Sequence, residues 1–111
     1  MKRGDLLTVS LRGNYGKPRP AVVIQSDRLA LRTSVLVCPL TSDLVEAISL
    51  RPIVEPSPET GLRTRSQVMV DKISVVEGHQ CGARIGQLDP ATMERLDASL
   101  AFVIGLTDSL S

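Results

Sequence analysis

The chain is poor in aromatic side chains. Its 111 residues include one Tyr, one Phe and no Trp, although 42% of them are hydrophobic. The core is therefore expected to be aliphatic, built from Val, Ile, Leu and Ala. The same scarcity excludes a surface on which aromatic rings stack successive bases as the main way of holding a nucleic acid.

Histidine and cysteine are also scarce. The single histidine, His79, lies in a predicted turn and is expected to be solvated, and its being alone excludes a ribonuclease mechanism that needs two histidines. Cys38 and Cys81 are far apart and belong to no C-x-x-C motif, so a structural zinc site is not expected. Cys38 lies in an apolar run and is predicted to be a small buried side chain.

Long hydrophobic segments are missing. The chain opens with charged residues, lacks an apolar stretch of the secretory type and has no run long enough to span a bilayer. We therefore expect a protein of the reducing cytoplasm that makes no membrane contact. Its length predicts a single domain over residues 1–111.

The charge is small overall but unevenly distributed. The net charge is +1, yet residues 1–32 hold seven basic and two acidic side chains, whereas residues 33–111 hold six basic and ten acidic ones. If this clustering survives folding, the basic third forms a patch for a polyanion; otherwise the charges are dispersed over the surface.

Short apolar runs separated by turn residues predict a mainly β protein. Pro39, near the end of the third run, argues against a place in the middle of a strand ladder. The segment 26–32 is either one helical turn or a loop, and 73–76 continues or follows the fifth strand. Expected strands cover residues 5–10, 21–25, 34–40, 48–55, 66–71 and 84–88, and loops cover 12–18 and 56–62.

A C-terminal amphipathic helix is predicted from about Pro90 to Leu106. Asp89 is a favourable N-cap, and proline suits the first helical position. Apolar residues then recur at steps of three and four, which places them on one face of the helix. The residues of that face are Met93, Leu96, Leu100, Val103 and Ile104.

The segment 16–24, Gly-Lys-Pro-Arg-Pro-Ala-Val-Val-Ile, is the most informative stretch. Pro18 and Pro20 restrict the backbone on both sides of Arg19, and the following apolar residues anchor the end of the loop in the core. A guanidinium held in this way loses little freedom when it binds, which predicts a contact with a phosphate or carboxylate.

Thr41 and Ser42 follow another apolar run, Val37-Cys38-Pro39-Leu40. Hydroxyl groups at the end of a strand can donate hydrogen bonds to phosphate oxygens. The alternative is a capping or turn pair that precedes Asp43. The spacing alone favours the turn.

Several segments together resemble the MazF/PemK family of toxin endoribonucleases. They occur in the family's order and span nearly the whole chain: Arg3-Gly4-Asp5, Lys17 to Ile24, Val37 to Ser42, Pro56 to Leu62, Ser66 to Ile73, and Ile85 to Leu88. The resemblance implies a small SH3-like barrel of the MazF/PemK/CcdB type with added helices. It also implies a homodimer that acts as the toxin of a type II toxin–antitoxin pair.

The same resemblance implies an activity. Such toxins cut single-stranded RNA at short sequences without a metal or other cofactor, giving a 2′,3′-cyclic phosphate and a 5′-OH, and a cognate antitoxin inhibits them. The family's active arginine corresponds to Arg19 and its active threonine to Thr41. Some members also use an arginine two residues before an aspartate. Here Asp71 is present and is a further candidate for RNA binding, but Met69 stands in place of that arginine.

RNA contacts are expected mainly from the 12–18 loop and from strand surfaces. Arg12 and Lys17 would meet phosphates, and Tyr15 would either stack on one base or pack back onto the barrel. Four further polar residues are candidates for phosphate or base contacts, although each also suits an ordinary strand or turn position. These are Ser26, Ser42, Ser66 and Gln67.

Two other functions remain open. One is a non-enzymatic gyrase poison similar to CcdB, but that family carries an aromatic residue at its C-terminal end, and this chain ends Leu106-Thr107-Asp108-Ser109-Leu110-Ser111. The other is an inactive barrel that binds only its antitoxin, against which the presence of Arg19 and Thr41 argues.

Overall fold

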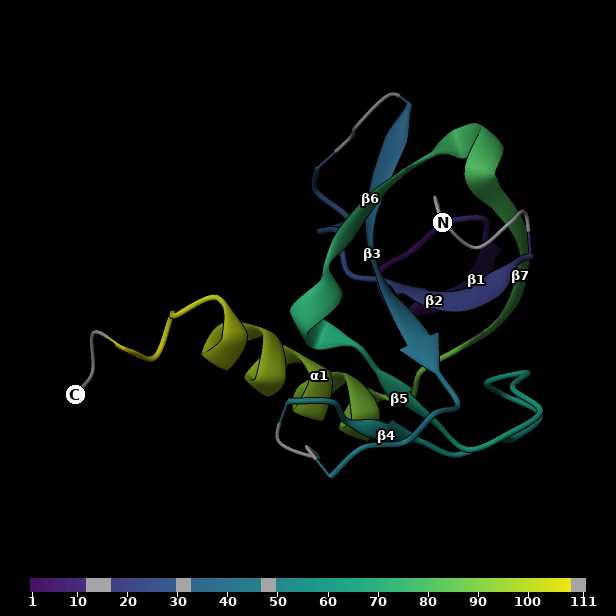
Figure 1. Ribbon diagram of the computed structural model, residues 1–111. Helices are drawn as coiled ribbons and strands as arrows, with labels where there is room; N and C mark the ends of the chain where they lie inside the picture. The colour runs from purple at the N-terminus through teal and green to yellow at the C-terminus, as the bar shows by residue number, and fades with distance from the viewer. Residues whose placement is uncertain (12–16, 30–32, 47–49, 109–111) are drawn as a thin grey trace.

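The protein folds around one strongly curved antiparallel sheet with a helix at its C-terminal end (Figure 1). The structure, a computed structural model, describes residues 1–11, 17–29, 33–46 and 50–108. The strands are β1 (Asp5–Val9), β2 (Arg19–Val23), β3 (Ser34–Thr41), β4 (Ile53–Val54), β5 (Ser66–Val68), β6 (Ser74–Glu77) and β7 (Cys81–Gln87). Two 3₁₀ turns, η1 (Val70–Lys72) and η2 (Gly78–Gln80), and one α-helix, α1 (Pro90–Val103), complete the described elements.

The strand order is β4-β5-β3-β2-β1-β7, and β6 also pairs with β3. All pairings are antiparallel. In Figure 1 the strands curl into a half-barrel, and α1 lies beside β4 and β5. The predicted class, mainly β with a C-terminal helix, is confirmed.

β3 is the central strand because it has three partners. It pairs with β2 along one side, and on the other side with β6 through residues 34–37 and with β5 through residues 40–41. The expectation that Pro39 would not lie within a ladder is wrong, since Pro39 pairs with Ala21 inside β3.

The position of Pro39 explains where β5 ends. Met69 N donates to Pro39 O at 2.8 Å, but proline has no N–H to return to Met69 O. That carbonyl instead accepts a hydrogen bond from Lys72 N at 2.9 Å, which closes η1. The predicted strand at 66–71 is therefore only three residues long, and Asp71 lies in the 3₁₀ turn.

Two aliphatic clusters hold the sheet together. Alternate residues of β1 and β2 contribute to different clusters, because successive side chains point to opposite faces of a strand. The first cluster comprises Leu6, Val22, Cys38, Leu40, Val54, Leu62, Val68, Val70, Leu88 and Leu96. The second comprises Leu7, Val9, Ala21, Val23, Val35, Val37 and Val76.

Cys38 is completely buried in the first cluster, as predicted. Burial raises the pKa of its thiol to about 12, so the side chain stays protonated at neutral pH and acts as a small apolar residue.

Helix α1 begins as predicted, because the Asp89 side chain accepts a hydrogen bond from Thr92 N at 2.8 Å and Pro90 occupies the first turn. Leu96 is fully buried, and Met93, Leu100 and Val103 pack against the first cluster. The helix ends at Val103, before Gly105, which has a φ of 82°. Ile104, predicted to lie on the apolar face of this helix, follows its last residue and is 56% exposed.

The other differences concern strand boundaries. The strand expected at 48–55 is confined to Ile53–Val54, and residues 47–49 lie outside the described part. β7 begins at Cys81, earlier than expected, and the described residues of 26–32 form no helix. Among the described residues, no helix is both long and apolar enough to cross a membrane.

Candidate active site

Arg19 and Thr41 lie at the same end of the sheet. Arg19 is the first residue of β2 and Thr41 the last of β3. Ala21 and Pro39 form the last pair of the β2–β3 ladder, and Arg19 and Thr41 each lie two residues beyond that pair. Past it, β2 continues alongside β1 and β3 alongside β5. Two residues far apart in the sequence thus lie at the same end of the sheet.

A cavity of about 490 Å³ opens at this end, which we call the Arg19 cavity. Its volume is in the range usual for small-molecule sites. Leu40, Leu62 and Ile85 in its wall belong to or pack against the first cluster, so the cavity has an apolar floor. Its lining consists of Thr8, Pro18, Arg19, Pro20, Leu40, Ser42, Gly61, Leu62, Arg63, Thr64, Ser66 and Ile85. Thr41 lies between two lining residues in the sequence, Leu40 and Ser42.

The Arg19 cavity carries unneutralised positive charge. No acidic residue lines it in the part of the chain that the structure describes. Among the described residues, four arginines form ion pairs: Arg3, Arg51, Arg65 and Arg84. Arg19 is exposed and has no carboxylate partner among these residues. An exposed guanidinium beside a cavity without acidic groups favours an anionic ligand.

The Thr41 side chain has the turn role that its spacing suggested. Its Oγ1 accepts a hydrogen bond from Asp43 N at 3.0 Å. A threonine hydroxyl can accept and donate at once, so this bond holds the side chain in place and leaves its proton to donate. The two interpretations of Thr41 are therefore compatible.

Gln67, a candidate for base recognition, is only 1% exposed. Its Oε1 accepts from Val45 N at 2.7 Å, and its Nε2 donates to Val45 O at 2.9 Å and to Arg51 O at 3.1 Å. Gln67 also pairs with Thr41 across β3 and β5. In this structure Gln67 fastens the segment after Thr41 to the sheet, and binding a base would require these hydrogen bonds to break.

Three other predicted contacts lie at the same end. Ser42 is exposed and lines the Arg19 cavity. Ser66 also lines it, although the residue is 4% exposed and its Oγ donates to Thr64 O at 3.0 Å. Lys17 is exposed and adjoins Pro18 of the lining.

Asp71 does not line the Arg19 cavity. Its carboxylate accepts two hydrogen bonds from the Arg51 guanidinium, each 3.0 Å long. The Arg51 hydrogen bond holds the pKa of Asp71 below its usual range. The pairing arginine comes from position 51, before β4, and nothing in the local sequence around Asp71 announces it.

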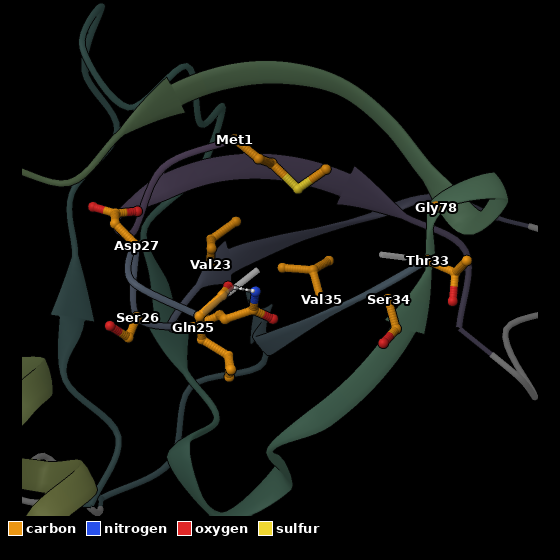
Figure 2. A pocket seen from close by; sticks show the side chains of 10 residues that line it. Met1, Val23, Gln25, Ser26, Asp27, Thr33, Ser34, Val35 and Gly78 are labelled. Carbon is orange, nitrogen blue, oxygen red and sulfur yellow. Dashed lines mark hydrogen bonds between the residues drawn. The ribbon is translucent and has the colours of Figure 1, made fainter. Parts of the chain in front are cut away.

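Ser26 lies at the other end of the β2–β3 pair, beyond Val23. It lines a second cavity, of about 320 Å³, which we call the Gln25 cavity (Figure 2). Figure 2 shows Val23, Gln25 and Val35 at its centre and Met1, Asp27 and Gly78 around it. The structure therefore does not bring Ser26 together with Arg19. Arg12 and Tyr15 lie outside the described residues.

The described residues contain no cluster of three or more His, Cys, Asp and Glu side chains that could hold a metal ion. His79 is exposed in η2, consistent with the predicted turn. Sequence reasoning missed the part of the wall formed by Gly61, Leu62 and Arg63. The approach of Gly61 to Ile85 of β7 depends on contacts between distant segments, although an arginine two residues after a turn glycine is a visible signal.

A family model described as "PemK-like, MazF-like toxin of type II toxin-antitoxin system" matches residues 2–104. The chain belongs to this family. The resemblance inferred from the separate motifs is thereby confirmed over almost the whole length.

Individual members of the family agree with this assignment. "Probable endoribonuclease MazF" of Mycolicibacterium smegmatis is 42% identical over 107 residues, which cover 96% of this chain and 98% of that protein. The Mycobacterium tuberculosis toxin MazF-mt6 has a similar structure, with a TM-score of 0.75 at 21% identity over 91% of this chain and 96% of that one. An endoribonuclease in complex with its cognate antitoxin, from a mycobacterial species, also gives a TM-score of 0.75, at 23% identity over 96% of both chains. The two structures support the fold.

Proposed function

We propose that residues 1–111 form one toxin domain of a toxin–antitoxin pair and that this domain is an endoribonuclease for single-stranded RNA. The observation that carries the proposal is that Arg19 and Thr41 lie two residues beyond the last β2–β3 pair, where Arg19, Leu40 and Ser42 line one cavity that has no acidic lining among the described residues. The family match and the 42% identical relative named as a probable endoribonuclease support it.

The proposed reaction is transesterification within the RNA. The 2′-oxygen attacks the adjacent phosphorus as its proton leaves, the bond from phosphorus to the 5′-oxygen breaks, and that oxygen takes up a proton. The products are a 2′,3′-cyclic phosphate and a 5′-OH, and the step requires no metal ion.

Arg19 has the role of stabilising the transition state. Negative charge grows on the phosphoryl oxygens as the fifth bond to phosphorus forms, and fixed hydrogen-bond donors aimed at such charge are often the largest catalytic contribution. Because a guanidinium remains charged at physiological pH, Arg19 is assigned no proton abstraction. The Thr41 hydroxyl, held by Asp43 N, donates to a phosphoryl oxygen or orients the 2′-OH.

The proposed partners follow from the same site. A cognate antitoxin would inhibit the enzyme by covering the Arg19 cavity, whose uncompensated guanidiniums suit an acidic peptide segment. The active form is proposed to be a homodimer in the cytoplasm.

The decisive experiment is cleavage of single-stranded RNA by the purified protein in EDTA. We expect Arg19→Ala or Thr41→Ala to lower the rate at least about 100-fold, or roughly 3 kcal/mol in the barrier. Thr41→Ser, which keeps the hydroxyl, should retain most of the activity. Arg28→Ala is the charge-matched control, because Arg28 is exposed at the opposite end of β2.

The product ends test the chemistry separately. Fragments with a 5′-OH accept phosphate from polynucleotide kinase without prior phosphatase treatment, whereas 5′-phosphorylated fragments do not. Full activity of both alanine variants would show that the site is assigned wrongly. Inhibition of gyrase supercoiling without RNA cleavage would favour the CcdB-like function instead.

A further inference from the structure

Arg63 is a second unpaired guanidinium at the Arg19 cavity. It lines the cavity from the segment between β4 and β5, whereas Arg19 lines it from β2. Among the described residues it forms no ion pair, whereas Arg65, two positions further on, pairs with Glu55. The protein thus neutralises the arginine outside the cavity and leaves the one that lines it free.

The backbone beside Arg63 is held firmly. Gly61 has a φ of 69°, and a side chain there would collide with the carbonyl oxygen of Ile85. Gly61 N donates to Ser57 O at 2.9 Å, and Leu62, next in the chain, is buried in the first cluster. On the other side of Arg63, Thr64 O accepts from Ser66 Oγ. The cavity wall is therefore preformed, and the Arg63 side chain on it is exposed.

The lining of the Arg19 cavity has the chemistry of a nucleotide site. Its apolar lining includes Leu40, Leu62 and Ile85, and two cations without an ion-pair partner among the described residues, Arg19 and Arg63, also line it. A nucleotide within an RNA strand has a flat base, and one phosphate lies on each side of its sugar. Resting on the proposed function, we infer that this cavity holds a nucleotide adjoining the scissile phosphate, with its base on the floor and its other phosphate against Arg63.

Arg63 suits a phosphate better than a base edge. Reading a base requires a guanidinium whose direction is fixed, because the two donors must match two acceptors. The described residues provide no hydrogen bond or ion pair that orients the exposed side chain of Arg63. A phosphate contact needs mainly proximity of charge, positions the strand and is independent of sequence. Arg63 is thus a positioning residue for the substrate.

The salt dependence of RNA binding tests this role. The probe is a 2′-O-methyl copy of a cleaved oligonucleotide, which lacks the attacking hydroxyl, and the variants are Arg63→Gln and Arg65→Gln. Losing one phosphate contact to a single strand reduces the slope of log K against log salt by about 0.7. We expect this change for Arg63→Gln, and no change for Arg65→Gln, which removes the same charge outside the cavity. Arg63→Lys should restore most of the slope.

Cleavage kinetics give a second readout. Arg63→Gln should raise KM and leave kcat within about twofold, because the contact exists equally in the ground and transition states. The cleaved sequence should stay the same. The inference would be overturned if the salt-dependence slope of RNA binding were the same for Arg63→Gln and Arg65→Gln, or if Arg63→Gln changed the cleaved sequence. Cleavage by the wild type would still support the proposed function in either case. A wild-type protein that neither cuts nor binds RNA would overturn both.

Discussion

The two ends of the β2–β3 pair differ in how their polar groups are used. At the Gln25 cavity, Gln25 bonds to Leu29 O and Leu36 N, Asp27 accepts from Arg3 N, and Ser26 accepts from Arg28 N. At the Arg19 cavity, Arg19 and Arg63 have no carboxylate partner among the described residues. Polar groups with internal partners stabilise the fold, whereas unpaired charges on a preformed wall are available to a ligand.

A glycine at each cavity gives the largest contrast in stability. Gly61→Ala at the Arg19 cavity would force a positive φ on alanine and push its Cβ into Ile85 O, whereas a Cβ at Gly78 of the Gln25 cavity would have only Thr33 O near it, at 3.7 Å. We expect Gly61→Ala to lower the free energy of unfolding by about 3 kcal/mol. Gly78→Ala should change it by less than about 0.5 kcal/mol.

Urea denaturation measures both glycine variants under the same conditions. Equal destabilisation would mean that the wall beside Arg63 is no more constrained than the opposite end of the sheet. In that case the Arg19 cavity would not be preformed, and the contrast between the two ends would lose its basis.

Replacing a glutamine at each end of the β2–β3 pair should change the free energy of unfolding by an intermediate amount. Gln67→Leu removes the partner of Val45 N, Val45 O and Arg51 O, whereas Gln25→Leu acts at a half-buried side chain whose partners belong to half-buried Leu36 and exposed Leu29. Loss of buried hydrogen-bond partners should cost about 2 kcal/mol for Gln67→Leu and less than about 1 kcal/mol for Gln25→Leu. Thermal unfolding and urea midpoints check the order.

Gln67→Leu also tests the expected base contact of Gln67. If the Gln67 side chain contributes to stability and does not contact a base, the variant is less stable and still cuts the same RNA sequence. A changed cleavage sequence with unchanged stability would show that Gln67 reads a base and that its hydrogen bonds in this structure are readily exchanged.

The smallest expected effect concerns how the free energy of unfolding changes at acidic pH. The hydrogen bond from Arg51 lowers the pKa of Asp71 in the folded state. The pair therefore stabilises the folded state at pH values above the unfolded pKa of about 3.9. This contribution is lost as the pH falls through the folded pKa. Asp71→Asn should cost less than about 1 kcal/mol at pH 7, because the pair is partly exposed. Its stability should fall less steeply than that of the wild type below about pH 4.

Melting temperatures of the wild type and Asp71→Asn at pH 7 and pH 3 test this sign. A difference between the two proteins that grows toward pH 3 would contradict the pairing of Asp71 with Arg51. The expected result would place Asp71 among the internally paired groups, with those of the Gln25 cavity.

Local chemistry made part of the fold readable from the sequence. The aliphatic core followed from the scarcity of aromatics, and the start of α1 from Asp89 and Pro90, whose effects act within one turn. The role proposed for Arg19 was likewise inferred from its two neighbouring prolines, and it stays a prediction. Each of these features depends on residues adjacent in the chain, so no knowledge of distant contacts was required.

Long-range pairing determined what the sequence did not reveal. The ladder position of Pro39, the hydrogen bonds of Gln67 and the ion pair of Asp71 with Arg51 all join segments separated by many residues. The role proposed for Arg63 likewise depends on the Gly61 segment reaching β7. Such contacts leave no periodicity in the sequence, and propensity alone cannot locate them.

Pro39 also protects the alignment on which the site depends. A strand without side-specific constraints can slip along its partners, which would exchange the two faces of β3. Here the residue that lacks an amide hydrogen stands opposite the one carbonyl, Met69 O, that Lys72 N already satisfies. A shifted alignment would set Pro39 against a strand carbonyl in need of a donor. The ring of one proline thus favours a single register of β3, and with it the placement of Thr41 and Arg19 at the same end of the sheet.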